Sequence, residues 1–257
     1  MSNEHAINYR VGTLQAVLGE LAADDIVRLA TDALFPGRIA FTSSFGSDSA
    51  VLLHMVARWA PATPVLFLDT GKLFVETHAY RDQLIAQLGL LDVRSVRSRS
   101  SLLAAGDPAG QLWQSDTERC CALRKVVPLD QALVPFDAWI TGRKRFQTTE
   151  RTALAVFEVA DAGRVRINPL AAWSESDIED YLARHQLPRH PLVAKGYRSI
   201  GCEPCTSRTM PGEPTRAGRW RGEARKECGI HSLRRPRGKP VEPMPISPIA
   251  ETEDTHV

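Results

Sequence analysis

The chain has 257 residues, of which 43% are hydrophobic and 24% charged, values close to the averages for globular domains. This composition excludes a largely disordered, collagen-like or coiled-coil protein, and no apolar run approaches the roughly 20 residues needed to cross a bilayer. The net charge of +2 is too balanced to indicate a nucleic-acid partner. We therefore expect a cytoplasmic protein that binds neither nucleic acid nor membrane.

Strand-like runs alternate with helix-like segments through the first half of the chain. Short apolar runs predict strands over 39–45, 64–69, 92–96 and 137–141, and helical periodicity predicts helices over 48–59 and 74–88 and a third that runs through 126. Such alternation is typical of right-handed strand–helix–strand crossovers. It predicts an α/β fold with a doubly wound, mostly parallel sheet, whose ligands bind at the carboxyl ends of the strands.

The second half changes in character. Residues 153–168 carry a hairpin signal, and Ser174 with Asp177 predicts a capped helix that ends near 185. After 187 the chain is rich in Pro, Gly, Cys and Arg, so we expect irregular structure there. We expect a loosely ordered segment over 1–20, an α/β binding domain over 21–210, a mobile segment over 211–232 and a disordered tail over 233–257.

Five cysteines fall in a pattern of four plus one: Cys120 and Cys121, then Cys202 and Cys205, then Cys228 alone. Clustered cysteines in a reducing compartment more often hold a metal than form disulfides. A structural zinc site is one interpretation, but zinc sites usually draw each pair from a C-x2–4-C motif, and an adjacent pair strains a small tetrahedral centre. The spacing favours a larger iron–sulfur cluster, and a strained vicinal disulfide is a third possibility.

The loop that follows the first predicted strand has the sequence SSFGSDS over 43–49. Its hydroxyls and backbone N–H groups, at the start of a helix, suit an anion, although Ser47 or Asp48 could simply be a helix cap. The loop resembles the SGGxDS loop of the ATP-pyrophosphatase-like nucleotide-binding superfamily, except that Phe45 replaces a glycine. We infer that the bulky ring reduces the room for a pyrophosphate and leaves space for a smaller anion.

The end of the second predicted strand is another candidate contact region. Asp69, Thr70 and Gly71 follow an apolar run and are either ligand contacts or an ordinary turn in which Gly71 adopts a positive φ. Arginine outnumbers lysine by 26 to 6. This bias reflects either drift in base composition or bidentate contacts to phosphate and sulfate, and the composition alone leaves both open.

Several longer motifs carry a family resemblance. CCALRK, SIGCEPCT, RAGRW and KECGIH, together with WITGRKRFQ and INPLAAWSESDIEDYL, resemble the assimilatory adenylyl-sulfate reductases, the cluster-bearing branch of the family of PAPS and APS reductases. The resemblance covers about 43–231 and implies an adenine nucleotide alpha hydrolase-like fold. The related phosphoadenylyl-sulfate reductases keep the last cysteine and lack the other four.

The resemblance implies a function. Cys120, Cys121, Cys202 and Cys205 would ligate a [4Fe–4S] cluster with a structural and electrostatic role. Cys228, whose thiolate the neighbouring basic residues can stabilise, would attack the sulfur of adenosine 5′-phosphosulfate (APS), release AMP and carry an S-sulfonate. Thioredoxin or glutaredoxin would then release sulfite, in sulfate assimilation and cysteine biosynthesis. The candidate substrate-binding residues are Ser43, Ser44, Phe45, Gly46, Asp48, Ser49, Asp69, Thr70, Gly71, Lys125, Arg151, Arg216, Arg219 and His231.

Other interpretations remain open at this point. The substrate could be 3′-phosphoadenylyl sulfate (PAPS), or both nucleotides, because the Arg-rich composition and the Ser98–Ser100 region could serve an extra phosphate. An ATP-dependent enzyme related to the tRNA-thiolation enzymes would also use the first loop and the metal cysteines, although Phe45 disfavours it. A non-catalytic, zinc-stabilised binding module would leave the reactive setting of Cys228 unexplained. The chain could also form a homo-oligomer.

Overall fold

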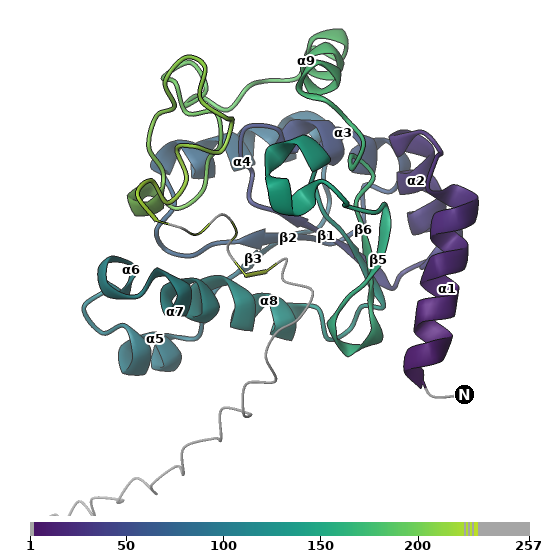
Figure 1. Ribbon diagram of the computed structural model, residues 1–257, viewed down its shortest axis with the longest axis horizontal. Coiled ribbons are helices and arrows are strands. Elements are labelled where there is room, and N and C mark those ends of the chain that lie inside the picture. Colours follow the sequence, from purple (N-terminus) through teal and green to yellow (C-terminus); the bar gives the residue numbers. More distant parts are fainter. Residues whose placement is uncertain (1–2, 224, 226, 228, 231–257) are drawn as a thin grey trace, which may run out of the picture.

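One mostly parallel sheet organises the molecule (Figure 1). The computed structural model describes residues 3–223, 225, 227, 229 and 230. Within these ranges six strands pair in the order β3-β2-β1-β4-β6-β5, and only the β5–β6 pair is antiparallel. The strands are β1 (Ile39–Ser43), β2 (Val65–Leu68), β3 (Val93–Val96), β4 (Ala138–Ile140), β5 (Phe157–Val159) and β6 (Val165–Ile167).

Helices cover both faces of this sheet, which confirms the predicted doubly wound α/β fold. In Figure 1, α3 and α4 lie on one side and α5 to α8 lie on the other. The α-helices are α1 (Asn3–Leu18), α2 (Ala23–Leu29), α3 (Ser49–Trp59), α4 (Val75–Leu88), α5 (Ser100–Gly106), α6 (Leu112–Ser115), α7 (Thr117–Cys121), α8 (Val127–Ala132) and α9 (Glu175–Arg184). Shorter turns are the π-helical η1 (Ala30–Leu34) and η2 (Ala122–Val126) and the 3₁₀ turns η3 (Arg145–Gln147), η4 (Thr149–Arg151), η5 (Asp161–Gly163) and η6 (Glu203–Cys205).

The alternation of side chains along the central strands explains why both faces are buried. Val65 and Phe67 of β2 join the larger apolar cluster, whereas Leu66 and Leu68 join a second cluster with Leu129 of α8. Successive side chains of a strand point to opposite faces, so a continuous apolar run needs cover on both sides. In the described part of the chain, no helix has the length and apolar character required to span a membrane.

The N-terminal segment differs from the expectation of a loosely attached chain. Asn3–Leu18 forms α1, which runs along the edge of the sheet beside β5 (Figure 1). The Val11 side chain is buried, and the side-chain oxygen of Gln15 accepts a hydrogen bond from the backbone N–H of Phe157 at 2.9 Å. An edge strand leaves such donors unpaired, so this helix satisfies part of the sheet edge.

The segment after Leu187 is largely irregular, as expected, but it is fixed to α4. His190 is fully buried, and its Nδ1 accepts a hydrogen bond from the backbone N–H of Leu192. In the neutral tautomer its Nε2–H therefore donates to Thr77 Oγ1, 3.0 Å away. Leu192 also packs with Phe74 and Ile200. These contacts hold the chain that leads to Cys202. The predicted tail over 233–257 lies outside the described residues.

The pH dependence of stability tests this anchor. Burial lowers the pKa of His190 to about 4, whereas a histidine in the unfolded chain titrates near 6.5. Between these values the unfolded state binds the extra proton, so the free energy of unfolding falls as the pH is lowered from 7 to 5, by about 2 kcal/mol from this residue. We expect urea titrations to show that this portion of the pH dependence is lost in His190→Gln and retained in His5→Gln, a change at an exposed position. An unchanged pH dependence in His190→Gln would contradict the assignment.

Candidate active site

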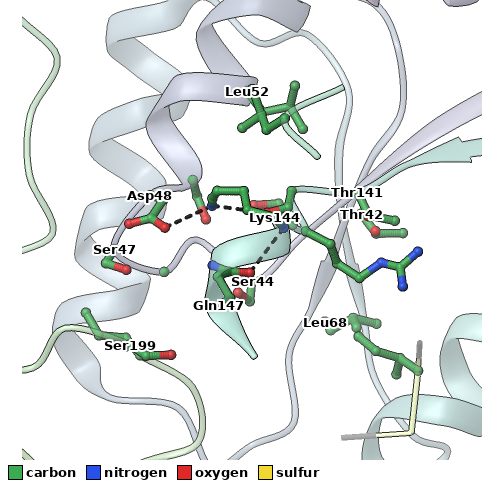
Figure 2. Close-up of a pocket in the computed structure, with 18 of the residues that line it drawn as sticks. Thr42, Ser44, Ser47, Asp48, Leu52, Leu68, Thr141, Lys144, Gln147 and Ser199 are labelled. Atoms are coloured by element: carbon green, nitrogen blue, oxygen red, sulfur yellow. Dashed lines mark hydrogen bonds and ion pairs between the residues drawn. The ribbon is translucent and has the colours of Figure 1, made fainter. Parts of the chain in front are cut away.

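A polar pocket lies at the carboxyl ends of β1 and β4 (Figure 2). The connections from these two neighbouring strands lead in opposite directions across the sheet, because β2 and β6 flank the β1–β4 pair. Such a switch point opens a crevice in doubly wound sheets. The polar and charged side chains and glycines that line it are Thr42, Ser43, Ser44, Gly46, Ser47, Asp48, Ser49, Thr141, Gly142, Arg143, Lys144, Gln147, Arg151, Ser199 and Arg216.

Asp48 connects the first loop to the loop after β4. It occupies the N-cap position of α3, but its side chain makes no capping hydrogen bond. Its carboxylate instead accepts a hydrogen bond from Lys144 Nζ at 2.9 Å (Figure 2). Burial opposes ionisation of this carboxyl, yet the Lys144 ammonium holds the pKa of Asp48 below its usual value. The helix-cap interpretation is therefore wrong for Asp48, whose carboxylate is committed to a buried ion pair.

Phe45 lies in the predicted loop, but its ring faces the core. The side chain is fully buried, and its ring meets Phe67 edge to face at 5.3 Å between centroids. The residue has a φ of 47°, a left-handed conformation that glycine adopts more easily. The Phe45 ring therefore does not take room from a ligand, contrary to the expectation from the sequence, because this side chain does not line the pocket. Any contact of Phe45 with a ligand would have to come from its backbone.

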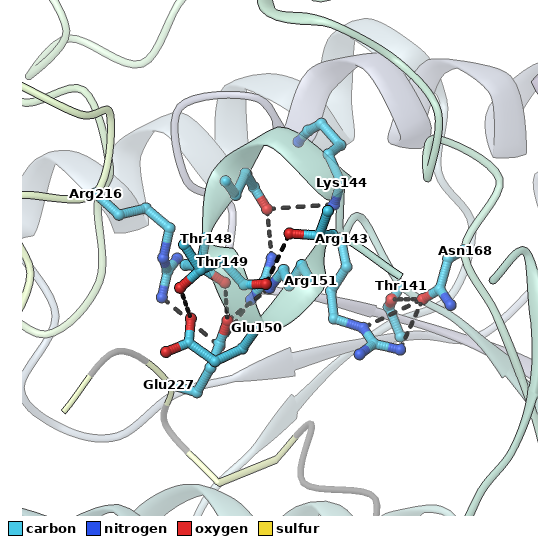
Figure 3. A network of polar contacts seen from close by, with 12 residues as sticks. Thr141, Arg143, Lys144, Thr148, Thr149, Glu150, Arg151, Asn168, Arg216 and Glu227 are labelled. Atoms are coloured by element: carbon cyan, nitrogen blue, oxygen red, sulfur yellow. Dashed lines mark hydrogen bonds and ion pairs between the residues drawn. The ribbon is translucent and has the colours of Figure 1, made fainter. Parts of the chain in front are cut away.

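A network of buried polar side chains fixes the loop after β4 (Figure 3). Arg143 pairs with Glu158 and donates from Nε and Nη2 to the side-chain oxygen of Asn168. Asn168 also accepts a hydrogen bond from Thr141 Oγ1 at 2.6 Å. Burial, with the nearby Arg166, lowers the pKa of Arg143 to about 10, so the guanidinium stays charged at neutral pH. The network holds a cation at the pocket wall.

Two predicted substrate-binding arginines share one carboxylate at the pocket (Figure 3). Arg151 donates from Nε and Nη2 to the two carboxylate oxygens of Glu227, at 2.6 and 2.7 Å. Arg216 Nη2 lies 3.7 Å from the same carboxylate. Ile230 also lines the pocket. Cys228 and His231, the predicted nucleophile and its neighbour, lie outside the described residues.

The four clustered cysteines line a second, smaller cavity. Cys120 and Cys121 come from α7, and Cys202 and Cys205 come from the irregular segment and η6. The same cavity is lined by the cationic side chains of Lys72, Arg124 and Lys125. Within the described ranges, no group of three or more His, Cys, Asp or Glu side chains is arranged to hold a metal ion. The donor set of four thiols among three cations nevertheless has the chemistry that an anionic iron–sulfur cluster requires.

The thiols differ in their acidity. Burial raises the pKa of Cys120 and raises that of Cys205 to about 11. Burial also opposes the thiolate of Cys202, but the Lys125 ammonium and the Thr70 hydroxyl, which lies 3.2 Å from Cys202 Sγ, hold its pKa below the usual value. Cys202 is therefore the most readily ionised of these three thiols.

The loop after β2 supports the cysteine cavity and does not line the pocket. Thr70 contacts Cys202 and its carbonyl accepts from Arg124 Nη1 at 2.9 Å. Gly71 has the expected positive φ of 67°. Asp69 accepts hydrogen bonds from Arg97 and from the backbone N–H of Gly71. These contacts indicate a structural role, and substrate binding by the loop stays a prediction.

Lys125 and Arg219 are likewise away from the lining of the larger pocket. Lys125 lines the cysteine cavity and is buried. The guanidinium of Arg219 lies over the Trp220 ring, 4.5 Å from its centroid. It also approaches Gly201 so closely that a β-carbon there would lie 2.3 Å from Arg219 Nη1. Gly201, next to Cys202, therefore leaves space for this cation.

Several residues that line the pocket are not among the candidates that the sequence indicates. They are chiefly Thr42, Thr141, Arg143, Lys144, Gln147 and Ser199. A signal is present for four of them, since Thr141 ends the strand predicted over 137–141 and residues 142–147 follow it, at the edge of the sheet where β1 also ends. Ser199 comes from irregular chain, for which periodicity gives no position.

A buried ion pair beside the cysteines generates a stability prediction. Arg124 donates from Nε and Nη2 to Asp107 Oδ2, and both side chains are at most 9% exposed. Arg124→Met would leave the Asp107 carboxylate buried without its cation, so we expect the free energy of unfolding to fall by about 3 kcal/mol. Arg119→Met, an exposed position of α7, should change it by no more than about 0.5 kcal/mol. Denaturant titration measures both, and equal effects would contradict the prediction.

Comparison with known proteins agrees with this architecture. A model of the phosphoadenosine phosphosulfate reductase domain matches residues 38–208. The chain is 53% identical over 218 residues to a Mesorhizobium japonicum protein named adenosine 5′-phosphosulfate reductase, covering 85% of each. It is 37% identical over 202 residues to a Gloeobacter violaceus protein named phosphoadenosine 5′-phosphosulfate reductase, covering 77% of this chain and 84% of that one.

A solved structure is also similar. The crystal structure of phosphoadenylyl-sulfate reductase from Candida auris, in a phosphate complex, superposes with a TM-score of 0.66 at 27% identity, covering 80% of this chain and 98% of that chain. The family model spans most of this chain, and the M. japonicum relative is more than half identical to it. The chain is therefore an enzyme of the phosphoadenosine phosphosulfate reductase family.

Proposed function

We propose that this chain reduces adenosine 5′-phosphosulfate to sulfite and AMP, with thioredoxin or glutaredoxin as the reductant, in sulfate assimilation and cysteine biosynthesis. One observation carries the proposal. The residues on either side of position 228, Glu227 and Ile230, both lie at the pocket, Glu227 through Arg151 and Arg216 and Ile230 as part of the lining. In the sequence, Cys228 stands between them.

The pocket offers the groups that a sulfonucleotide needs. The hydroxyls of Ser43 and Ser44 line the pocket at the end of β1, and that of Ser49 stands at the start of α3, where backbone N–H groups favour an anion. Arg151 and Arg216 present guanidinium groups, which match phosphate and sulfate oxygens in bidentate geometry. These groups would bind the phosphosulfate and orient its sulfur, while the carboxyl edge of the sheet supports the nucleoside.

The proposed reaction has three steps and needs two thiols from the reductant. The Cys228 thiolate attacks the sulfur of the substrate, an S–S bond forms, and the S–O bond to the phosphate breaks as AMP leaves. A thiolate of the reductant then attacks the Cys228 sulfur and expels sulfite. Its second thiol resolves the mixed disulfide, so the reductant ends as a disulfide and Cys228 as a thiol. The two electrons that reduce the sulfur come from the dithiol.

Cys120, Cys121, Cys202 and Cys205 would hold a [4Fe–4S] cluster, with Lys125 beside Cys202. When bound, the cluster would supply a fixed charge and a rigid support. The two-electron balance above needs no electron from it. The chain's own part is to keep Lys125 and Arg219 beside Cys202, whose thiolate both cations stabilise.

The relative from G. violaceus is named for the 3′-phosphorylated nucleotide, which is therefore a second candidate substrate. The relative named for the unphosphorylated nucleotide is more similar, at 53% identity against 37%. The presence of Cys120, Cys121, Cys202 and Cys205 in addition to Cys228 also favours APS, through the resemblance described above. We therefore propose APS as the preferred substrate.

The S-sulfonate can be detected directly. After mixing with APS in the absence of reductant, we expect mass spectrometry to find one SO₃ adduct on the peptide that contains Cys228, and none in Cys228→Ser. Addition of reduced thioredoxin should remove the adduct and release sulfite. Parallel reactions with PAPS compare the two nucleotides by kcat/KM. An adduct on any of the other four cysteines would contradict the proposed nucleophile.

Metal analysis tests the cofactor separately. Anaerobically purified protein should contain about four iron and four sulfide per chain, as expected for a cluster bound by four cysteines. Cys121→Ser or Cys205→Ser should lose most of this iron, whereas Cys228→Ser, the matched control, should retain it. Zinc without iron or sulfide in the wild-type protein would overturn the cluster in favour of a zinc site.

A further inference from the structure

We propose that the carboxylate of Glu227 occupies the anion site formed by Arg151 and Arg216, and that an anionic group of the substrate must displace it. The inference deepens the proposed function, on which it rests. Glu227 competes with the substrate for the two arginines. Its side chain occupies the site in the absence of the nucleotide and leaves it when the nucleotide binds.

The geometry is that of a bound oxyanion (Figure 3). Both carboxylate oxygens of Glu227 accept hydrogen bonds from the fork of Arg151, and Arg216 approaches from the other side. Thr148 Oγ1 adds a weaker contact at 3.4 Å. A bidentate guanidinium contact with a second cation is the arrangement that proteins use for phosphate and sulfate.

Charge balance makes simultaneous occupation unfavourable. In the described part of the pocket, each lining cation already has a carboxylate partner: Arg143 has Glu158, Lys144 has Asp48, and Arg151 and Arg216 share Glu227. A phosphosulfate that entered beside Glu227 would bring further negative charge next to a carboxylate, and like charges at short distance repel strongly in a partly buried site.

Of these carboxylates, Glu227 is the one that can leave at least cost. Glu158 stands on β5 and also pairs with Arg166 and Asn168, and Asp48 belongs to the loop that opens α3. Glu227 comes from the irregular C-terminal part and its side chain is 22% exposed, whereas Arg151 is only 7% exposed. A buried guanidinium left alone is costly, so Glu227 departs when another anion replaces it.

The exchange would link nucleotide binding to the residue that reacts. Glu227 directly precedes Cys228 in the sequence, and its carboxylate is held by an arginine 76 residues away. When the substrate binds Arg151 and Arg216, the contact between Glu227 and Arg151 breaks, at the stage of the reaction in which the Cys228 thiol is needed. The same contact lowers the affinity for nucleotide, because part of the binding free energy is used to displace it.

Binding measurements separate this exchange from a merely structural contact. The probe is APS, titrated by calorimetry against the full-length chain in a Cys228→Ser background so that no transfer occurs, with AMP and adenosine as further ligands. We expect Glu227→Gln to lower the Kd for APS by roughly tenfold, the order expected when one charged contact no longer has to be broken. The Kd for adenosine, which has no anionic group, should stay unchanged.

The control is Glu223→Gln, which removes an exposed carboxylate of the same segment that contacts Thr117 and should leave every Kd unchanged. An unchanged or weaker affinity of Glu227→Gln for APS overturns the exchange, as does an equal change in the affinities for APS and adenosine. If those results coincide with a Cys228 adduct in the wild-type protein, the exchange alone is lost. If neither APS nor AMP binds any variant, the exchange and the proposed function fall together.

Discussion

Buried cations at the carboxyl edge of the sheet each require an anion, and this constraint organises the site. The Lys144 side chain is 3% exposed and Arg143 is 7% exposed, which would be very costly without their carboxylate partners. Asp48 and Glu158 supply those partners from different elements, β1–α3 and β5. The Lys144–Asp48 pair therefore joins the two sides of the switch point, and the Arg143–Glu158 pair ties the loop after β4 to β5.

The cysteine cavity is separate from the pocket, since the two have no lining residue in common. The loop after β2 belongs to the cavity, because Thr70 contacts Cys202 and accepts from Arg124. The π-helical turn η2 carries Arg124 and Lys125 directly after the cysteine pair. Pro128 lacks the N–H that would continue regular i to i+4 bonding at this point, which favours the wider turn.

How far the sequence predicts this structure depends on the range of the interactions. The central strands and α3 follow from local apolar patterns, and the cap of α9 by Ser174 and Asp177 is confirmed. The packing of α1 does not follow from local patterns, because the hydrogen bond from Phe157 N–H to Gln15 joins residues 142 apart. A pattern also gives no side-chain direction in a loop, which is why Phe45 was expected at the ligand. The pairing of Arg151 with Glu227 is equally non-local.

The arginine-rich composition alone does not show what these residues do, whereas their positions in the structure do. Exposed arginines such as Arg38 form pairs with exposed carboxylates, and these contribute little to stability. Arg151 uses the same fork against both oxygens of Glu227, where two parallel bonds fix both partners, and Arg124 directs Nε and Nη2 to one oxygen of the buried Asp107. A lysine could supply the charge but not this planar geometry. An arginine fork that binds both oxygens of a carboxylate can bind two oxygens of a sulfate or phosphate in the same way. Glu227, which balances the charge of Arg151 in the absence of substrate, therefore marks the position where an anionic group of the substrate binds.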